Sequence, residues 1–231
     1  MAKTFLLIGG NSGIGLETAK MLQHQGANLI VASRSSDQLS KLGIQTQAFD
    51  AENPSQLDLP DQLDGLIYFP GTINLKPFHR LTSDDFKKEF QINFLAAVDI
   101  IQQALPALKA APTASIVMFS TVAVAQGMPF HASIASSKGA IEGLTKSLAA
   151  EFAPKIRVNA IAPALTDTPL VAHLLGNDAK REASAKRHPL QAVGTAKDVA
   201  TIAAYLLSDA SKFITGQIQR PDGGLSTVRT F

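Results

Sequence analysis

Short apolar runs alternate with longer helical patterns along most of the chain, and this alternation constrains the fold more than any other feature. The apolar runs lie at 4–9, 28–33, 44–49, 65–69, 115–120 and 156–162. Consecutive apolar residues are typical of strands that are buried on both faces of a sheet. Helical periodicity occupies 13–25, 82–110, 130–153 and 196–208. We therefore expect an α/β fold with a parallel sheet and helices on both of its faces.

One domain over residues 1–231 accounts for this pattern. The chain has 231 residues, of which 45% are hydrophobic, and this is enough to bury one large core. No linker rich in Pro, Gly or Ser divides it. The segment 166–195 interrupts the alternation and contains Pro169, Gly176 and Pro189. A loop or small helical flap is expected there, which is the usual position of a substrate lid.

Composition excludes several kinds of site and partner. The formal net charge of +2 argues against a protein that binds nucleic acid through its phosphates. The chain has no cysteine, which excludes disulfides, thiolate catalysis and cysteine metal ligands, and favours a reducing compartment. The histidines have no metal-ligand spacing, so we expect no metal site. The apolar run FLLIGG is too short to span a membrane, and a cytoplasmic protein without membrane association is predicted.

A glycine-rich loop, IGGNSGIGLETA at 8–19, follows the first apolar run and opens the first helical pattern. Glycines permit a sharp turn and close approach of a ligand, and a helix N-terminus offers N–H groups to a phosphate. On spacing alone the loop would also fit a tight connection. Its position between a strand and a helix favours a dinucleotide-binding loop. The residues assigned to it are Gly9, Asn11, Ser12, Gly13, Ile14 and Gly15.

The tip of the second apolar run indicates which dinucleotide this loop binds. The run ends in VASRSS, with Ser33 and Arg34 at its tip and no acid before Asp37. A carboxylate there would bind an adenosine ribose and repel a 2′-phosphate, whereas an arginine attracts one. We therefore expect NADP(H) as the cofactor. The alternative is that Arg34 is a solvated loop residue.

Several motifs in this order resemble those of the short-chain dehydrogenase/reductase family, over nearly the whole chain. The glycine loop matches that family's G-x-x-x-G-x-G, and FITGQIQRPDGG at 213–224 resembles its C-terminal signature. The resemblance implies a Rossmann-type, doubly wound sheet of seven parallel strands with the cofactor across their carboxyl ends. It also implies cofactor contacts at four further positions, which are Asp50, Gly71, Pro163 and Thr168.

The family's chemistry uses an Asn, a Ser, a Tyr and a Lys, the last two as Y-x-x-x-K. By resemblance Asn93 matches the Asn, Thr121 the Ser and Lys138 the Lys, and these three are the candidate catalytic residues. The tyrosine position is Ile134, one helical turn before Lys138 on the same face. An isoleucine has no proton to give, and a positioned general acid contributes about 10²–10⁴-fold to the rate.

Three other side chains bear on the missing acid. His131 precedes Lys138 by seven residues, so it could share the cleft-facing side of the helix and relay a proton. The alternative is a partly exposed histidine at a helix start. Tyr68 and Tyr205 are not at the tyrosine position. We expect Tyr68 to pack beneath the cofactor and Tyr205 to lie in the core.

The motifs support competing functions. The first is an NADP(H)-dependent oxidoreductase acting on a small carbonyl or alcohol in a modified site. The second is an NADP(H)-binding sensor or partner subunit that has lost catalysis. A third is hydride transfer to an activated alkene or an iminium, which needs no acid at position 134. By resemblance to the family, whose long helices pair across a twofold axis, we expect a homodimer or homotetramer.

Overall fold

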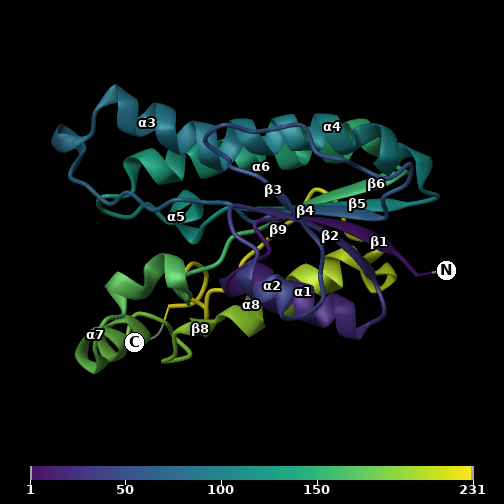
Figure 1. Ribbon diagram of the computed structural model, residues 1–231. Helices are drawn as coiled ribbons and strands as arrows, with labels where there is room; N and C mark the ends of the chain where they lie inside the picture. The colour runs from purple at the N-terminus through teal and green to yellow at the C-terminus, as the bar shows by residue number, and fades with distance from the viewer. Residues whose placement is uncertain (1, 230–231) are drawn as a thin grey trace.

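Seven parallel strands form the central sheet of the computed structural model, which describes residues 2–229 (Figure 1). The strands are β1 (Thr4–Ile8), β2 (Asn28–Ser33), β3 (Thr46–Ala48), β4 (Gly65–Tyr68), β5 (Ala114–Phe119), β6 (Ile156–Ile161) and β9 (Ile218–Gln219). Their spatial order is β3-β2-β1-β4-β5-β6-β9. The order reverses between β1 and β4, and such a reversal opens a crevice at the carboxyl ends of parallel strands. The predicted doubly wound fold is confirmed.

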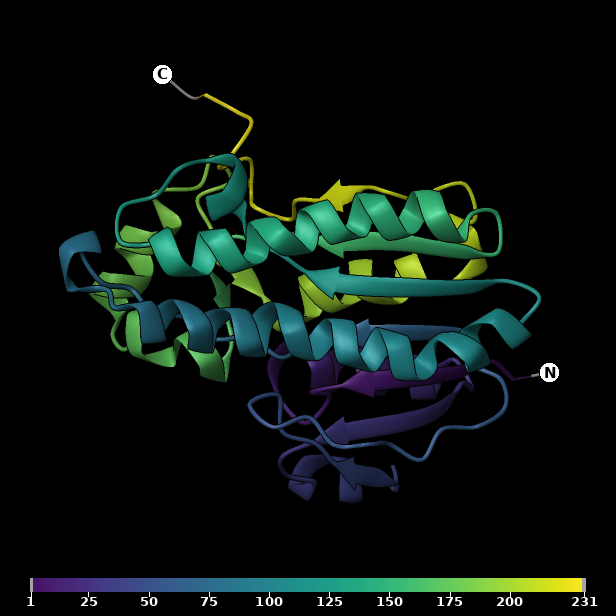
Figure 2. The same cartoon turned by 90° about the horizontal axis from the view of Figure 1, so that it is seen from above.

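Helices cover both faces of the sheet. They are α1 (Gly13–His24), α2 (Asp37–Ser40), α3 (Ser83–Phe90), α4 (Ala96–Ala110), α5 (Val122–Ala125), α6 (Ala132–Phe152), α7 (Asp178–Ala185) and α8 (Ala196–Leu207), with 3-10 turns η1 (Phe78–Arg80), η3 (Pro169–Leu174) and η4 (Asp209–Ser211). The helices α4 and α6 lie side by side over one face, while α1 and α8 lie under the other (Figures 1 and 2). This arrangement leaves the outer sides of α4 and α6 available to a second copy of the chain.

Two hydrophobic clusters, one on each face, explain why the strands are apolar at consecutive positions. Leu6 and Ile8 of β1 enter the cluster beneath α4 and α6. Phe5 and Leu7 enter the cluster above α1 and α8. Because successive strand side chains point to opposite faces, a strand between two helical layers needs an apolar residue at every position.

The helical pattern predicted at 82–110 is helical from 83 to 110, where α3 and α4 are joined without a break by a π-helical turn, η2 (Gln91–Leu95). At this turn, side-chain groups donate hydrogen bonds to backbone carbonyl oxygens. The Tyr68 hydroxyl donates to the Ile92 carbonyl at 2.6 Å, and Asn93 Nδ2 donates to the Glu89 carbonyl at 2.9 Å. A π turn of this kind is often found at functional sites. It brings Asn93, a candidate catalytic residue, to the inner side of the helix.

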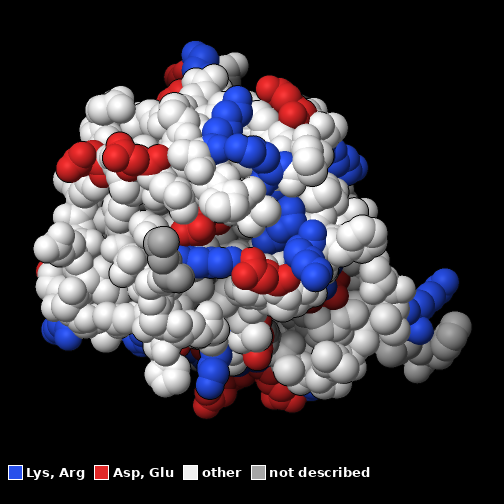
Figure 3. All heavy atoms as spheres, turned by 90° about the vertical axis from the view of Figure 1, so that its right-hand side faces the viewer, with Lys and Arg blue, Asp and Glu red and all other residues white. Residues whose placement is uncertain are grey.

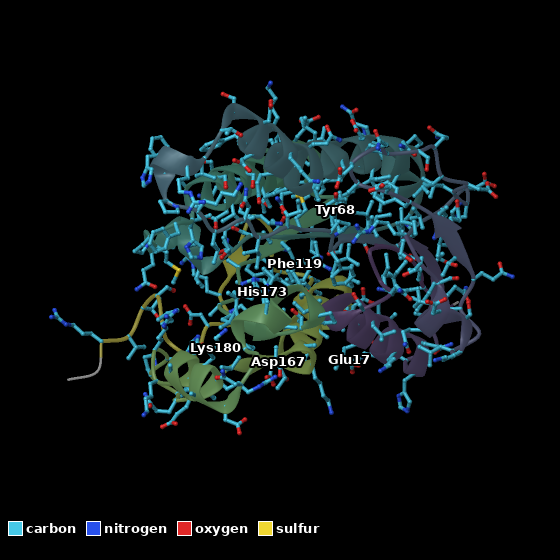
Figure 4. The ribbon with its side chains drawn as sticks, turned by 60° about the vertical axis from the view of Figure 1, so that its left-hand side comes forward. Glu17, Tyr68, Phe119, Asp167, His173 and Lys180 are labelled. Atoms are coloured by element: carbon cyan, nitrogen blue, oxygen red, sulfur yellow. The ribbon has the colours of Figure 1, made fainter. Side chains whose placement is uncertain are left out.

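The segment 166–195 is folded into η3 and α7, and short strands close its base. These are β7 (Thr166–Asp167) and β8 (Gly194–Thr195), which pair in parallel. An ion pair of 2.6 Å joins Arg181 of α7 to Asp167. Figure 4 shows Asp167, His173 and Lys180 together below the sheet, on the side that comes forward in that view. The segment therefore contains a 3-10 turn and a short helix above two paired strands, and its role as a substrate lid stays a prediction.

No helix within residues 2–229 is long and apolar enough to cross a membrane. On the face that carries the amino-terminal ends of the strands, Lys and Arg side chains are mixed with Asp and Glu (Figure 3).

The expectation that Tyr205 lies in the core is wrong. Tyr205 is 42% exposed, while its neighbours Ala203 and Leu206 in α8 are buried against the sheet.

Candidate functional site

The glycine loop leaves the N-terminus of α1 open. Gly9 has a φ of +84°, in the left-handed region that favours glycine. A Cβ on Gly15 would lie 2.5 Å from the Gly9 carbonyl oxygen, so only glycine allows this close turn. Within the described chain Ser12, the N-cap of α1, makes no capping hydrogen bond with its side chain. The first-turn N–H groups can therefore bind an anion such as a phosphate.

The loop is joined to the end of β2 by Asn11. Its Nδ2 donates to Ser35 Oγ at 2.6 Å, and its Oδ1 accepts from the Gln38 N–H at 3.3 Å. The Ser33 hydroxyl donates to the Ser35 carbonyl at 2.6 Å. Arg34 lies between these residues and is exposed to solvent. Asn11 therefore holds the predicted phosphate loop beside the exposed guanidinium.

Three further predicted cofactor residues lie at the same edge of the sheet. Asp50 follows β3, and its Oδ1 accepts from the Glu52 N–H at 3.0 Å. A Cβ on Gly13 would lie 3.3 Å from Thr168 Cβ, which places Thr168 against the glycine loop. The Pro163 carbonyl accepts from the Val122 N–H at 3.3 Å. These contacts bring together the segments that follow β1, β5 and β6, while Asp50 lies beyond the carboxyl end of β3.

Gly71, Asn93 and Lys138 meet in one cluster after β4. A Cβ on Gly71 would lie 3.2 Å from Asn93 Oδ1 and 3.5 Å from Lys138 Nζ. Asn93 Oδ1 also accepts from the Thr72 N–H at 3.2 Å, and its Nδ2 donates to Thr72 Oγ1 at 2.9 Å. Because all polar atoms of the Asn93 amide are engaged, the cluster is held in one arrangement.

Thr121 is the N-cap of α5, directly after β5. Its Oγ1 accepts from the Ala123 N–H at 3.3 Å. This bond uses a lone pair of the hydroxyl and leaves its hydrogen for donation elsewhere. Thr121 can therefore donate a hydrogen bond to a substrate oxygen, although a neutral hydroxyl is a weak acid.

Position 134 contributes no polar group. Ile134 is 4% exposed and Lys138 is 6% exposed, one turn apart in α6. Burial lowers the pKa of Lys138 to about 8, and the nearby negative charge of Glu89 acts in the opposite direction. Tyr68 does not replace the missing acid, since it is buried, donates to Ile92, and has its pKa raised by burial.

Glu89 is a site residue that the sequence analysis missed. It is 2% exposed at the end of α3, and its Oε2 accepts from Asn93 Nδ2 at 2.9 Å. Burial raises the pKa of Glu89, while Thr72, Lys138 and Asn93 act to lower it. Its spacing of four residues from Asn93 was the available signal, because residues i and i+4 lie on one helical face.

His131 lies at the start of α6. Its Nδ1 is 2.7 Å from the Pro129 carbonyl, and since a carbonyl only accepts, Nδ1 carries the proton and Nε2 is the acceptor in the neutral ring. His131 lines an open cavity of about 450 Å³ with Lys76, Phe78 and Met128. Neither Thr121 nor Lys138 is among the described residues that line this cavity. His131 therefore lines this open cavity at the start of α6, whereas Lys138 is buried about two turns further along the same helix.

Comparison with known proteins identifies the family. Residues 8–226 match the family described as Enoyl-(Acyl carrier protein) reductase. A tropinone reductase homolog of Arabidopsis thaliana is 32% identical over 245 residues, covering 98% of this chain and 93% of the relative. A 3-oxoacyl-[acyl-carrier-protein] reductase of Rickettsia felis is 30% identical, covering 98% of each. The chain belongs to the short-chain dehydrogenase/reductase family.

Solved structures agree with this assignment. The ligand-free aldohexose dehydrogenase of Thermoplasma acidophilum has a TM-score of 0.89 at 26% identity, covering 100% of this chain and 96% of the other. A structure described as ElxO with NADP bound has a TM-score of 0.86 at 25% identity, covering 97% and 99%. Short-chain dehydrogenases/reductases use nicotinamide cofactors, and this chain is an oxidoreductase of that family.

Proposed function

We propose that the chain is an NADP(H)-dependent oxidoreductase that interconverts a small carbonyl compound and its alcohol. The observation that carries the proposal is the cluster of Asn93, Lys138 and Gly71 beside the open N-terminus of α1, with Thr121 directly after the neighbouring strand β5. A protein that only bound a dinucleotide would need the glycine loop. It would have no need for the threonine hydroxyl after β5.

The glycine loop fits a dinucleotide, because the turn at Gly9 and Gly15 admits a phosphate where a side chain would exclude it. Bound there, the cofactor supplies or accepts a hydride. Arg34 and Ser33 favour a 2′-phosphate, since a guanidinium forms charge-assisted hydrogen bonds with phosphate oxygens. Asp50, Pro163 and Thr168 complete the contacts that we propose for this cofactor.

On the substrate side, Thr121 donates a hydrogen bond to the substrate oxygen, and Lys138 contributes a buried positive charge. Ile134 supplies no proton, so we propose that the alkoxide left by hydride addition takes its proton from a water molecule in the site, while the Thr121 hydroxyl donates a hydrogen bond to the same oxygen. We further propose that the segment 166–195 acts as the lid, because it contains Thr168, which lies against the glycine loop. Closure over the crevice would separate the reaction from bulk solvent.

A second candidate is the reduction of an activated alkene. Two observations favour it: position 134 lacks an acid, and the matched family is described as Enoyl-(Acyl carrier protein) reductase. Hydride addition to an alkene conjugated with a carbonyl leaves an enolate that water can protonate. This reaction places less demand on a positioned acid than carbonyl reduction does.

Fluorescence titration with NADPH and NADH tests the cofactor assignment. We expect tighter binding of NADPH, and loss of the preference in Arg34→Asp. Arg80→Asp, which makes the same charge change at an exposed arginine of η1, serves as the matched control. Equal affinities in the unmodified protein would contradict the assignment.

Turnover on a panel of ketones, aldehydes, enones and enoyl thioesters then separates the candidate functions. Reduction of carbonyl compounds supports the first, and reduction of alkenes alone supports the second. NADPH binding without turnover on the whole panel would favour a sensor or partner subunit that has lost catalysis.

A further inference from the structure

Glu89 and Lys138 are the two buried ionisable side chains of the Asn93 cluster. They come from α3 and α6, which pack against each other. In the family the lysine has an ionisable tyrosine one turn before it. Here that position is Ile134, which carries no charge in any protonation state.

The Glu89 carboxylate is surrounded by hydrogen-bond donors. Asn93 Nδ2 donates to its Oε2 at 2.9 Å. Burial raises the pKa of Glu89, and hydrogen bonds from the Thr72 side chain and the Asn74 backbone act to lower it. Such donors stabilise the charged form of a carboxylate.

Lys138 reaches the same cluster from α6: a Cβ on Gly71 would lie 3.2 Å from Asn93 Oδ1 and 3.5 Å from Lys138 Nζ, so both charged groups lie near the Asn93 amide. In this cluster their opposite charges attract each other. An acid placed only to fill space would not be supplied with three donors and a cation.

We propose that Glu89 is the counter-ion of Lys138, so that it keeps the lysine positively charged where the lysine faces the cofactor. This inference rests on the proposed function for the role of Lys138, and it assigns Glu89 as a positioning residue that acts through the lysine. A buried ammonium without a negative partner is costly, because burial disfavours the charged form. Glu89 supplies the compensating charge from a different helix.

Other charged groups around the pair are engaged elsewhere. On α3, Asp85 is paired with Lys76 at 2.8 Å. On α6, Glu142 accepts from the Ser120 hydroxyl at 2.7 Å. His131 is bonded to the Pro129 carbonyl. On α4, which lies beside α6, Lys109 Nζ lies 5.8 Å from the centre of the Phe152 ring at the far end of α6, and the charge of Asp99 acts on Tyr68. Arg157 of β6 donates to carbonyl groups near α8 and η4.

The test measures the protonation of Lys138 in the cofactor-free protein by NMR of lysine labelled with ¹³C and ¹⁵N. The Lys138 signal is assigned by its loss in Lys138→Arg. In the unmodified protein we expect a titration midpoint near pH 8. Glu89→Gln keeps the size of the side chain and removes its charge, and it should lower the midpoint by roughly 1–3 pH units.

Two control variants separate charge from structure. Asp84→Asn removes an exposed carboxylate from the same helix and should leave the midpoint unchanged. Glu89→Asp keeps the charge and should hold the midpoint closer to that of the unmodified protein. An equal Lys138 midpoint in Glu89→Gln and the unmodified protein would overturn the proposal.

A reciprocal measurement covers the case in which Glu89→Gln does not fold. In Lys138→Met the Glu89 carboxyl signal should titrate at higher pH than in the unmodified protein, because the stabilising cation is gone. An unmoved Glu89 titration would then overturn the counter-ion assignment. Both titrations use the protein without cofactor or substrate. Absence of turnover would therefore refute the proposed function and leave this inference intact.

NADPH affinity as a function of pH gives the functional consequence. In the unmodified protein we expect affinity to fall as the pH rises through about 8, since Lys138 loses its proton there. In Glu89→Gln the fall should occur at lower pH. A pH profile identical to that of the unmodified protein would contradict the proposed effect on cofactor binding.

Discussion

Replacing Ile134 with tyrosine should restore the acid that the family normally places in this site. Ile134 is buried one turn before Lys138, so a phenol at this position would extend toward the lysine and Thr121. With the pKa of Lys138 at about 8, roughly nine in ten of these side chains carry a charge at pH 7. That charge would lower the pKa of the new phenol.

The expected gain follows from the contribution of a positioned acid. Reduction of ketones or diketones by Ile134→Tyr should rise by up to about 10²–10⁴-fold. Insertion of a ring at a buried position has a cost, because overpacking destabilises a protein by about 1–3 kcal/mol. In a domain of this size each kcal/mol lowers the melting temperature by about 2–4 °C. A thermal melt should therefore accompany the kinetic assay.

Ile134→Phe is the matched control for this experiment. It introduces the same ring without the hydroxyl, so it carries the packing cost and supplies no proton. We expect NADPH-dependent carbonyl reduction to increase in the tyrosine variant only. Equal activities in the two variants, with both folded and both binding NADPH, would refute the reasoning that this site lacks only its acid.

Three further predictions concern the cofactor loop, the proton source and the assembly. Gly15→Ala should abolish dinucleotide binding, since its Cβ would lie 2.5 Å from the Gly9 carbonyl oxygen; fluorescence titration that finds unchanged affinity would contradict the assigned loop. His131→Ala should reduce native turnover if the imidazole relays the missing proton, and steady-state kinetics with unaltered kcat would exclude that role. The chain should form a homodimer or homotetramer through the outer sides of α4 and α6, and light scattering at micromolar concentration that gives a monomer mass would refute this.

Local patterns in the sequence were sufficient for most of the fold. The apolar runs at 4–9 and 28–33 became β1 and β2 with ends that differ by at most one residue. This prediction succeeded because the periodicity of a strand or helix reflects which of its residues are buried, and a short stretch of sequence is enough to show it. The seventh strand, β9, has only two residues, which are too few to show a period, and it was expected only from the family resemblance.

The glycine loop was also predictable, because its requirements are local. Gly9 needs a left-handed backbone and Gly15 a close turn against Gly9, and both partners lie within the same few residues. The sequence could show that Lys138 lacked a tyrosine at position 134, since that relation spans a single helical turn.

The partner of Lys138 was decided by tertiary structure. Glu89 appears in the sequence as one acid among several in a charged stretch, SDDFKKEF, where a solvent-exposed position is the default expectation. Only the packing of α3 on α6, together with the π turn that carries Asn93 inward, buries it in the same Asn93 cluster as the lysine. Helical periodicity determines which side chains share a face of one helix. Which charges meet across two helices depends on how those helices pack, and no short stretch of sequence contains that information.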